Sequence, residues 1–334
     1  MLKLHEELSL FQVSVQRLAD IFSPDRIFVV TVQDQAEELK RQQPEIPETN
    51  FLIEPIAKGT ASVIALAATA LMKRDPDAIM AVLTSDHFIG DEQRFREYLL
   101  AARDVALEGY LVTLGIEPNS PSTGFGYIQR GMYLGEYHQA QAYLIERFTE
   151  KPDLSTAQHY LEHGDYYWNS GMFIWKASQI LSEFNRQMPH LYHAIDKIFA
   201  SPDVKSRDIM TKKVWHSLEV QTIDYGIMEN AVQVTVIPTT GLNWNDVGSW
   251  DSLFEVMQAD PDGNILIGNG EHIGLDTKNS LLYLEQNNRL IVTIGINELI
   301  LVDTGDVILV CHKEHAQKVR QIVYYLKKQG SNYL

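Results

Sequence analysis

Two aspartates stand where a divalent cation could be held. Asp86 ends the apolar run AIMAVLTSD, and Asp246 lies between two tryptophans in LNWNDVGSW. Ligands of open α/β sheets bind beyond the carboxyl ends of the strands, and Mg²⁺ takes a few protein oxygens and completes its shell with phosphate and water. Asp246, fixed by its tryptophans, would be rigidly aimed, although the tryptophans also fit as simple hydrophobic anchors. The neighbouring His87 fits a hydrogen-bonded structural residue better than a ligand.

A third segment, EPIAKGTA, combines a carboxylate, a cation and a glycine at a helix start. Gly59 permits close backbone approach and Thr60 can cap the helix. The helix N-terminus offers amide donors to an anion or a base edge, and Lys58 could add positive charge. A capped turn between a strand and a helix, with no ligand, explains these residues equally well.

The elements that must position these residues alternate between strands and helices. Ser9-x-x-Gln12 is a capping box before an apolar helical pattern. Buried strands are then expected in RIFVVTV, FLIEP, AIMAVLTSD and GYLVTLGI, with helices at 33–43, 60–73 and 92–107 between them. This alternation predicts an α/β fold with a doubly wound, mostly parallel sheet of the Rossmann-like type.

The pattern of predicted strands and helices changes twice in the second half of the chain. Strands are expected in AYLIERFTEKP, YYWNSGMFIW and VQVTVIP, and helices at 177–186 and 191–200. Near Asp260 a run of short strands begins, with turns at Asn269-Gly270, Asn287-Asn288 and Thr304-Gly305. A helix at 314–328 follows. We therefore predict a catalytic domain over 1–260, incomplete at its N-terminus, and a small β module with a closing helix over 261–334.

The composition of the chain excludes several classes of partner and function. Acidic residues number 44 against 28 basic ones, a net charge of −16, which argues against nucleic acid or an anionic membrane as partner. The single cysteine, Cys311, excludes an internal disulfide and fits a buried apolar filler. No run reaches the roughly 18 apolar residues of a membrane-spanning helix, and the N-terminus lacks the pattern of a signal peptide. We expect a cytoplasmic protein.

Seven motifs, in this order and spacing, resemble the sugar-phosphate nucleotidyltransferases and, within them, the mannose-1-phosphate guanylyltransferases. The resemblance runs from about Leu4 to Lys328. It rests on EPIAKGTA, TSDH, GFGYI, EKP, WNSGMF, IDYGIME and NDVGSW. It implies transfer of GMP from GTP to mannose 1-phosphate with Mg²⁺ as cofactor, giving GDP-mannose and pyrophosphate.

The resemblance also assigns roles to individual residues. It implies that Asp86 and Asp246 hold the metal and that these two aspartates and Lys151 are the catalytic residues. Trp168, Phe173 and Trp175 are expected in the core, and Asp224 and Tyr225 are expected to fix a helix start. The implied nucleotide-binding residues are Glu54, Lys58, Gly59, Thr60 and Ser85. The implied sugar-phosphate-binding residues are Gly126, Tyr127, Glu150, Lys151 and Asn169.

The sequence departs from this family at its start. Members begin with a strand, a loop of the form Gly-Gly-x-Gly-Thr-Arg and a Pro-Lys pair, none of which is present. Loss of an interior strand leaves unpaired amides and a gap in the core. We favour a longer natural chain in which Met1 is internal, because the metal and sugar residues remain. The alternative is a genuinely short chain of poor stability and weak triphosphate binding.

Two rival functions stay open. One is a related nucleotidyltransferase with another sugar or base. The other is a catalytically inactive sugar-nucleotide-binding or regulatory protein, because the Gly-rich loop is missing. A homodimer is also left open, with the β tail as the surface for self-association.

Overall fold

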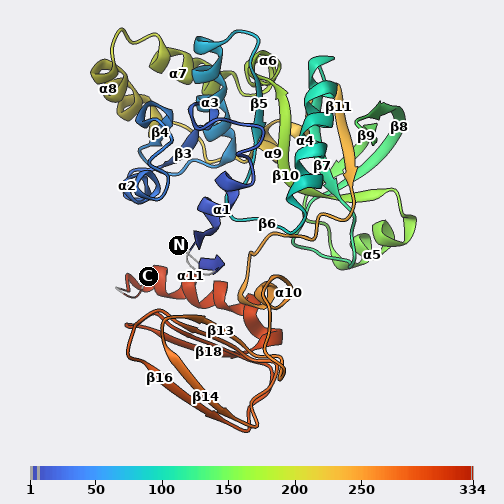
Figure 1. Ribbon diagram of the computed structural model, residues 1–334. Helices are drawn as coiled ribbons and strands as arrows, with labels where there is room; N and C mark the ends of the chain where they lie inside the picture. The colour runs from blue at the N-terminus through green and yellow to red at the C-terminus, as the bar shows by residue number, and fades with distance from the viewer. Residues whose placement is uncertain (1–2, 6–7, 332, 334) are drawn as a thin grey trace. The chain divides into compact units, whose positions relative to one another are not determined.

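The computed structural model describes residues 3–5, 8–331 and 333. Met1, interpreted above as an internal methionine, lies outside these residues. The chain forms two compact units, coloured along the sequence in Figure 1. The sheet unit comprises Gln16–Thr84 and Asp91–Leu242, and the module unit comprises Met1–Val15, Ser85–Gly90 and Asn243–Leu334. The domain boundary after residue 260 stays a prediction.

The sheet unit alternates strands and helices as expected. In chain order its main elements are β3 Val29–Val32, α2 Gln33–Gln42, β4 Phe51–Glu54, α3 Thr60–Arg74, β5 Ile79–Val82, α4 Glu92–Leu107, β7 Leu111–Ile116, β8 Tyr127–Tyr137, β9 Ala140–Thr149, α5 Leu154–His163, β10 Tyr166–Lys176, α6 Ala177–Gln187, α7 Pro189–Phe199, α8 Val204–Trp215, α9 Ile223–Gly226 and β11 Val234–Thr239. The helices α5 and α8 were not predicted from the sequence. Their signal is an N-cap aspartate, since Asp153 and Asp203 accept from the backbone amides of Thr156 and Ser206.

The main sheet has the strand order β5-β10-β7-β11-β9-β8. The α/β class is confirmed, but the pairing is more mixed than expected. Within this sheet β7 and β11 are parallel, whereas β10 is antiparallel to β5, β7 and β8, and β9 is antiparallel to β8 and β11. The β8–β9 hairpin and α5 precede β10 in the chain. The chain therefore enters β10 from the opposite end of the sheet, which periodicity alone cannot reveal.

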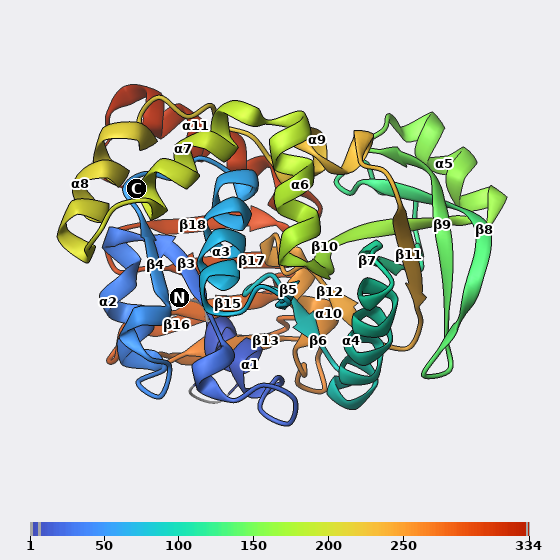
Figure 2. The ribbon, with the colours of Figure 1, turned by 90° about the horizontal axis from the view of Figure 1, so that it is seen from above.

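The strands β3 and β4 form a separate parallel pair. Both this pair and β5 pack under α3, and Figure 2 shows β3 and β4 to one side of that helix and β5 to the other. Within the described residues β3 pairs only with β4, and β5 pairs only with β10. Among the described residues, the strand layer is thus interrupted between β3 and β5.

The core of the sheet unit lies around α3, which has the Ala-rich sequence TASVIALAATALMKR. Small side chains let α6 and α7 approach it closely, so that Ala65 and Ala68 have no exposed surface. Trp175 and Trp215 fill the remaining volume and are also completely buried. The helix predicted at 60–73 is confirmed.

The module unit begins with the expected capping box. The amide of Gln12 donates to Ser9 Oγ at 3.2 Å, and the amide of Ser9 donates to Gln12 Oε1 at 3.0 Å. The other elements of this unit are β1 Lys3–His5, β2 Leu8–Ser9, α1 Leu10–Gln16 (whose last residue belongs to the sheet unit), β6 Phe88–Ile89, β12 Trp244–Asn245, η4 Trp250–Ser252, α10 Leu253–Val256, β13 Ile265–Gly268, β14 Glu271–Leu275, β15 Leu281–Leu284, β16 Leu290–Ile294, β17 Leu299–Asp303, β18 Ile308–His312, η5 Lys313–Lys318 and α11 Val319–Gln329.

The six short strands of the β module are all present, but most do not form hairpins. β13, β15 and β17 stack in parallel, β14 and β16 form a second parallel pair, and only β17–β18 is an antiparallel hairpin among the described strands of this module. The turns at Asn269-Gly270 and Asn287-Asn288 are therefore corners of a coil. Thr304-Gly305 is a hairpin turn. Figure 1 shows α11 on one side of the β module and β14 and β16 on the other.

The interrupted strand layer predicts a pattern of amide exchange. Alternate amides of β3 and β5 face an edge with no partner strand among the described residues, whereas β7 is paired on both sides by β10 and β11. Hydrogen–deuterium exchange followed by mass spectrometry should show exchange in β3 and β5 at least about tenfold faster than in β7. Equal protection of the three strands would contradict the interruption.

Candidate functional site

The two predicted metal aspartates belong to the same compact unit, although they are far apart in the chain. The short strands β6 and β12 pair antiparallel, with Trp244 opposite Ile89 and Asn245 opposite Phe88. Continued by one residue, this register puts Asp246 opposite His87, the neighbour of Asp86. The ladder thus brings the two carboxylate-bearing segments together.

Hydrogen bonds fix both segments. Trp244 Nε1 donates to His87 Nδ1 at 3.1 Å, so His87 has the structural role expected from the sequence. The hydroxyl of Ser14 on α1 donates to the carbonyl of Ser85 at 3.2 Å. Asn245 Oδ1 accepts from the amide of Val247 at 2.7 Å, which shapes the turn that carries Asp246.

The chemistry of this pair fits a hard divalent cation. Asp86 is exposed at the surface, yet partial desolvation by the chain around it is the main cause that raises the pKa of its carboxyl. Among the residues that the structure describes, no cluster of three or more His, Cys, Asp or Glu side chains could hold a metal. A pair of carboxylates suits Mg²⁺, which keeps water and phosphate in its shell.

Three of the residues that are predicted to bind the sugar phosphate lie in close contact in the sheet unit. Asn169 on β10 donates its backbone amide to the carbonyl of Gly126 at 2.8 Å. A Cβ on Gly126 would lie 2.4 Å from Glu150 Oε2 and 3.4 Å from the Cβ of Asn169. A side chain at position 126 would therefore require the Glu150 carboxylate to move from its present place.

Lys151 lies beside Glu150 in a strained backbone conformation. Its φ of 45° is in the left-handed region, which non-glycine residues rarely adopt. Its ammonium is 2.9 Å from Glu150 Oε1, and this hydrogen bond is the main cause that raises the pKa of Lys151. Lys151 is therefore a permanent cation, and its side chain stays more than half exposed. Such strain is common where a side chain must be aimed at a ligand.

Asp224 lies in the first turn of α9, and its carboxylate has a partner that the sequence did not predict. The helix α9 does start beside it, but Thr222 provides the cap by accepting from the amide of Tyr225. The Asp224 carboxylate instead accepts from Asn169 Nδ2 at 2.8 Å. Burial first, and the negative charge of Glu150 second, raise its pKa. The IDYGIME motif was the only signal, and no spacing rule connects it with β10.

The segment that is predicted to bind the nucleotide makes its contacts with other residues of the chain. Gly59 has φ 88°, and a Cβ there would lie 2.3 Å from the carbonyl oxygen of Gln221. That carbonyl accepts from the amide of Ala61 at 3.2 Å, so the start of α3 is closed by residue 221. The cap of α3 is Gly59, and the expected cap Thr60 accepts from the amide of Ile223 instead.

Two other residues of this segment also have internal partners. Lys58 Nζ donates to the carbonyl oxygens of His216 and Leu218 at 3.2 and 2.5 Å. Its charge is therefore used to hold the 216–218 segment. Glu54 accepts from the amide of Lys58 at 3.3 Å, and burial raises the pKa of Glu54. These contacts give the segment a structural role, and nucleotide contact by it stays a prediction.

Tyr127 and the aromatic residues of β10 lie in the core. Tyr127 is fully buried and donates its hydroxyl to the carbonyl of Ser122 at 3.0 Å, so it fixes the loop that precedes it. The buried positions of Trp168, Phe173 and Trp175 confirm the expectation for these residues.

Cys311 is only partly buried and packs against the core of the β module.

The mixed α/β sheet, the paired carboxylates and the parallel-stranded module define a nucleotidyltransferase of the Rossmann-like type. The chain belongs to the nucleotidyl transferase family, whose model matches residues 1–263. Residues 270–326 match the MannoseP isomerase/GMP-like beta-helix domain, which accounts for the stacked strands of the β module.

Curated relatives resemble the chain over almost its whole length. It is 36% identical to mannose-1-phosphate guanylyltransferase of Salmonella muenchen over 333 residues, covering 98% of this chain and 68% of that protein. It is 35% identical to that of Escherichia coli, covering 97% and 68%. Among solved structures, one named mannose-1-phosphate geranyltransferase from Thermus thermophilus matches with a TM-score of 0.84 and 32% identity, covering 97% and 91% of the two chains. No helix among the described residues is long and apolar enough to cross a membrane.

The raised pKa of Asp224 predicts that Asp224→Asn stabilises the folded chain at neutral pH. A carboxyl whose pKa is higher in the folded state binds more protons there, so stability falls as pH rises from the unfolded pKa to the folded one. The asparagine would keep an acceptor for Asn169 and remove the buried charge. The melting temperature should rise by about 2 °C at a pH of about 7.5, a gain of roughly 1 kcal/mol.

The control for this variant is pH. At a pH of about 3.5, where Asp224 is mostly protonated in both states, the gain should vanish. Scanning calorimetry at the two pH values measures it. A variant that is less stable than the native chain at neutral pH would contradict the burial argument.

Proposed function

We propose that this chain transfers GMP from GTP to mannose 1-phosphate, giving GDP-mannose and pyrophosphate. The observation that carries the proposal is the cluster of Gly126, Glu150, Lys151, Asn169 and Asp224, which gathers one cation and several sugar-hydroxyl partners at one point of a nucleotidyl transferase fold. The names of the curated relatives support the choice of sugar and nucleotide.

Each polar group of this cluster suits one part of a sugar phosphate. The exposed ammonium of Lys151 is a compact charge for the phosphate. The carboxylates of Glu150 and Asp224 can accept hydrogen bonds from sugar hydroxyls, and the amide of Asn169 can donate one. Because the cluster is built on β9, β10 and α9, it holds the sugar in a fixed orientation, which is the main contribution that phosphoryl transfer needs.

Asp86 and Asp246 would hold Mg²⁺. When bound, this ion neutralises phosphate charge and favours attack by the sugar phosphate oxygen on the α-phosphorus of GTP, with pyrophosphate leaving. The two carboxylates attract the cation into a protein whose net charge of −16 would otherwise repel the triphosphate. Glu54, Lys58, Gly59, Thr60 and Ser85 remain the proposed nucleotide contacts, and the cytoplasm remains the proposed location.

One observation favours a second candidate function. The edges of β3 and β5 that face no described strand interrupt the strand layer that packs against α3. A strand layer interrupted there gives a triphosphate less support, so the chain would bind a sugar nucleotide and release pyrophosphate slowly or not at all. A related nucleotidyltransferase with another sugar or base is the third reading.

A substrate panel tests the proposal. Pyrophosphate release should be measured with GTP, ATP, UTP and dTTP against mannose 1-phosphate and glucose 1-phosphate, with Mg²⁺. We expect GTP with mannose 1-phosphate to give at least about tenfold more release than any other pair, since a site that hydrogen-bonds its substrate rejects analogues lacking the partner group. Preference for another pair would replace the substrate assignment. Binding of GDP-mannose without pyrophosphate release from any pair would support the second candidate.

The control variant for this panel is Asp246→Asn, which keeps the shape of the side chain and removes its charge. We expect pyrophosphate release to fall by at least about 100-fold with an unchanged melting temperature, because the metal loses one of its two protein carboxylates. Release close to that of the native chain would remove Asp246 from the metal site.

We also propose that two copies of the chain associate through the β module. β14 and β16 are in register, with Ile273 opposite Val292 and Leu275 opposite Ile294, and all four side chains are more than half exposed. Leu290 continues this aliphatic face, and its partner on β14 is the exposed Glu271 at the end of the pair. Monomeric proteins rarely leave contiguous apolar faces of this kind exposed, and such a face can pack against its own copy.

Light scattering during size-exclusion chromatography tests this dimer. The native chain should have twice the mass of one chain, and Val292→Asp should convert it to the monomer without lowering the melting temperature by more than about 2 °C. Leu107→Asp, at an equally exposed leucine of the sheet unit, is the matched control and should stay dimeric. A monomeric native chain would refute the proposal.

A further inference from the structure

The residues that follow Asp246 enter the core of the β module. Leu253 is 1% exposed and belongs to a cluster with Ile265, Leu281 and Ile300 from the stacked strands. Val247 and Trp250 pack against the same cluster, and the ring of Trp250 lies 5.5 Å from that of Tyr283 on β15. The turn that carries the aspartate is therefore anchored in the β module by apolar contacts.

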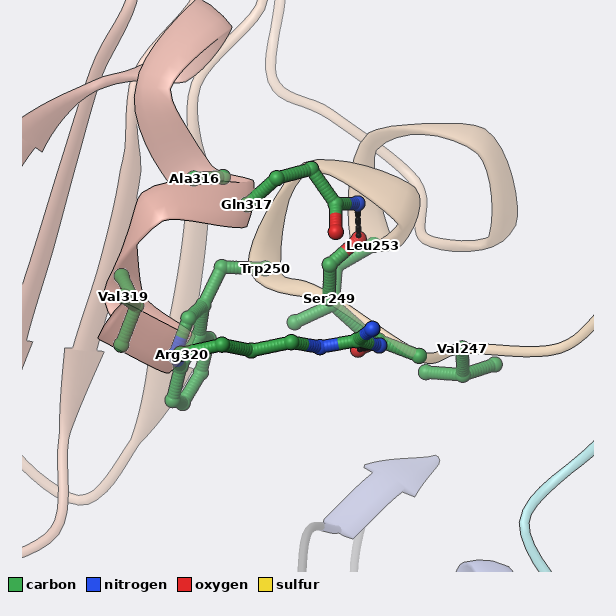
Figure 3. Close-up of a pocket in the computed structure, with 9 residues that line it drawn as sticks. Val247, Ser249, Trp250, Leu253, Ala316, Gln317, Val319 and Arg320 are labelled. Carbon is green, nitrogen blue, oxygen red and sulfur yellow. Dashed lines mark hydrogen bonds between the residues drawn. The ribbon is translucent and has the colours of Figure 1, made fainter. Parts of the chain in front are cut away.

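Polar contacts from the C-terminal helical segment fix the same turn from another direction. Gln317 on η5 donates its side-chain amide to Ser249 Oγ at 2.9 Å, as Figure 3 shows. Arg320 on α11 donates from its guanidinium to the carbonyl oxygen of Gly248 at 3.3 Å. A cavity of about 240 Å³ lies between the turn and this segment, with Trp250 and Leu253 among its lining residues.

The turn itself needs such support. Val247 has φ 46°, a left-handed conformation that is a genuine outlier for a β-branched residue. Strain of this kind costs on the order of 1–3 kcal/mol and persists only where the surroundings hold it. Gly248 then donates its amide to Asp246 Oδ1 at 3.4 Å, and a Cβ on Gly248 would lie 2.9 Å from Asp246 Oδ2.

We propose that the β module and its closing helix are the positioning element of the metal aspartate. Gln317 and Arg320 act as positioning residues, because they hold the hydroxyl of Ser249 and the carbonyl of Gly248, and Gly248 in turn contacts the Asp246 carboxylate. The inference rests on the proposed function of Asp246 as a metal ligand. It gives the β module a role in cation binding that is independent of self-association.

The test compares Gln317→Ala/Arg320→Ala with the matched control Lys327→Ala, which removes a cation from the far end of the same helix. Both changed side chains are exposed, so the melting temperature should stay within about 2 °C. Two readouts are taken: hydrogen exchange of the 246–250 amides, and the dissociation constant for Mn²⁺ alone, measured by electron paramagnetic resonance.

We expect exchange at 246–250 to become several-fold faster and Mn²⁺ to bind about tenfold more weakly, because two hydrogen bonds together contribute roughly that factor. Lys327→Ala should leave both readouts unchanged, and Arg320→Lys, with Gln317 intact, should keep the affinity for Mn²⁺ within about threefold. A kcat measured at saturating Mg²⁺ should fall less than the KM for Mg²⁺ rises.

The outcomes separate the inference from the proposed function. Asp246→Asn is measured beside these variants, and unchanged Mn²⁺ binding by it would overturn the metal assignment and the inference together. If Asp246→Asn loses Mn²⁺ binding while the double variant binds and exchanges like the native chain, the inference alone is wrong. Faster exchange without weaker Mn²⁺ binding would also refute it, since the order of the turn would then not serve the cation.

Discussion

The pairing of β6 with β12 is the constraint on which the candidate metal site depends. This ladder of two residues a side joins the segment of Asp86 to the segment of Asp246, and both then belong to one compact unit with the β module. A ladder so short has little stability of its own. Its support comes from the bond between Trp244 and His87 and from the apolar anchoring of the turn after Asp246 in the core of the β module. The segments that carry the two candidate aspartates are therefore physically connected with the core of the β module.

The candidate sugar-phosphate site depends on a different feature, which is the close approach of like charges. The Glu150 carboxylate lies where a Cβ on Gly126 would be, and the carboxylates of Glu150 and Asp224 repel one another in a partly buried setting. Lys151 has a strained backbone. Each of these features costs stability in the folded chain. The cost of burial is offset by α3, α6 and the sheet beneath them.

Local chemistry made much of the fold predictable. The capping box at Ser9 and Gln12, the Ala-rich α3 and the six strands of the β module follow from patterns within a few residues, and the structure contains all of them. The direction of the strands was harder to predict from the sequence. The alternation of strands and helices indicates parallel pairing, but β10 arrives after a hairpin and runs the other way. Turn residues in the β module predict where its strands end but not how the strands pair, because the partner of most strands is one full coil away.

The sequence by itself determined the class of protein and most of the candidate site, because those depend on residue types in fixed local order. Asp86, Glu150, Lys151, Asn169 and Asp246 could be singled out from their motifs alone. Only the tertiary structure decided which of these residues share a unit, that Lys58 is held by the carbonyls of His216 and Leu218, and that Asp224 faces Asn169. These facts depend on contacts between segments distant in the chain. Such contacts are set by how whole elements pack, which no local pattern encodes.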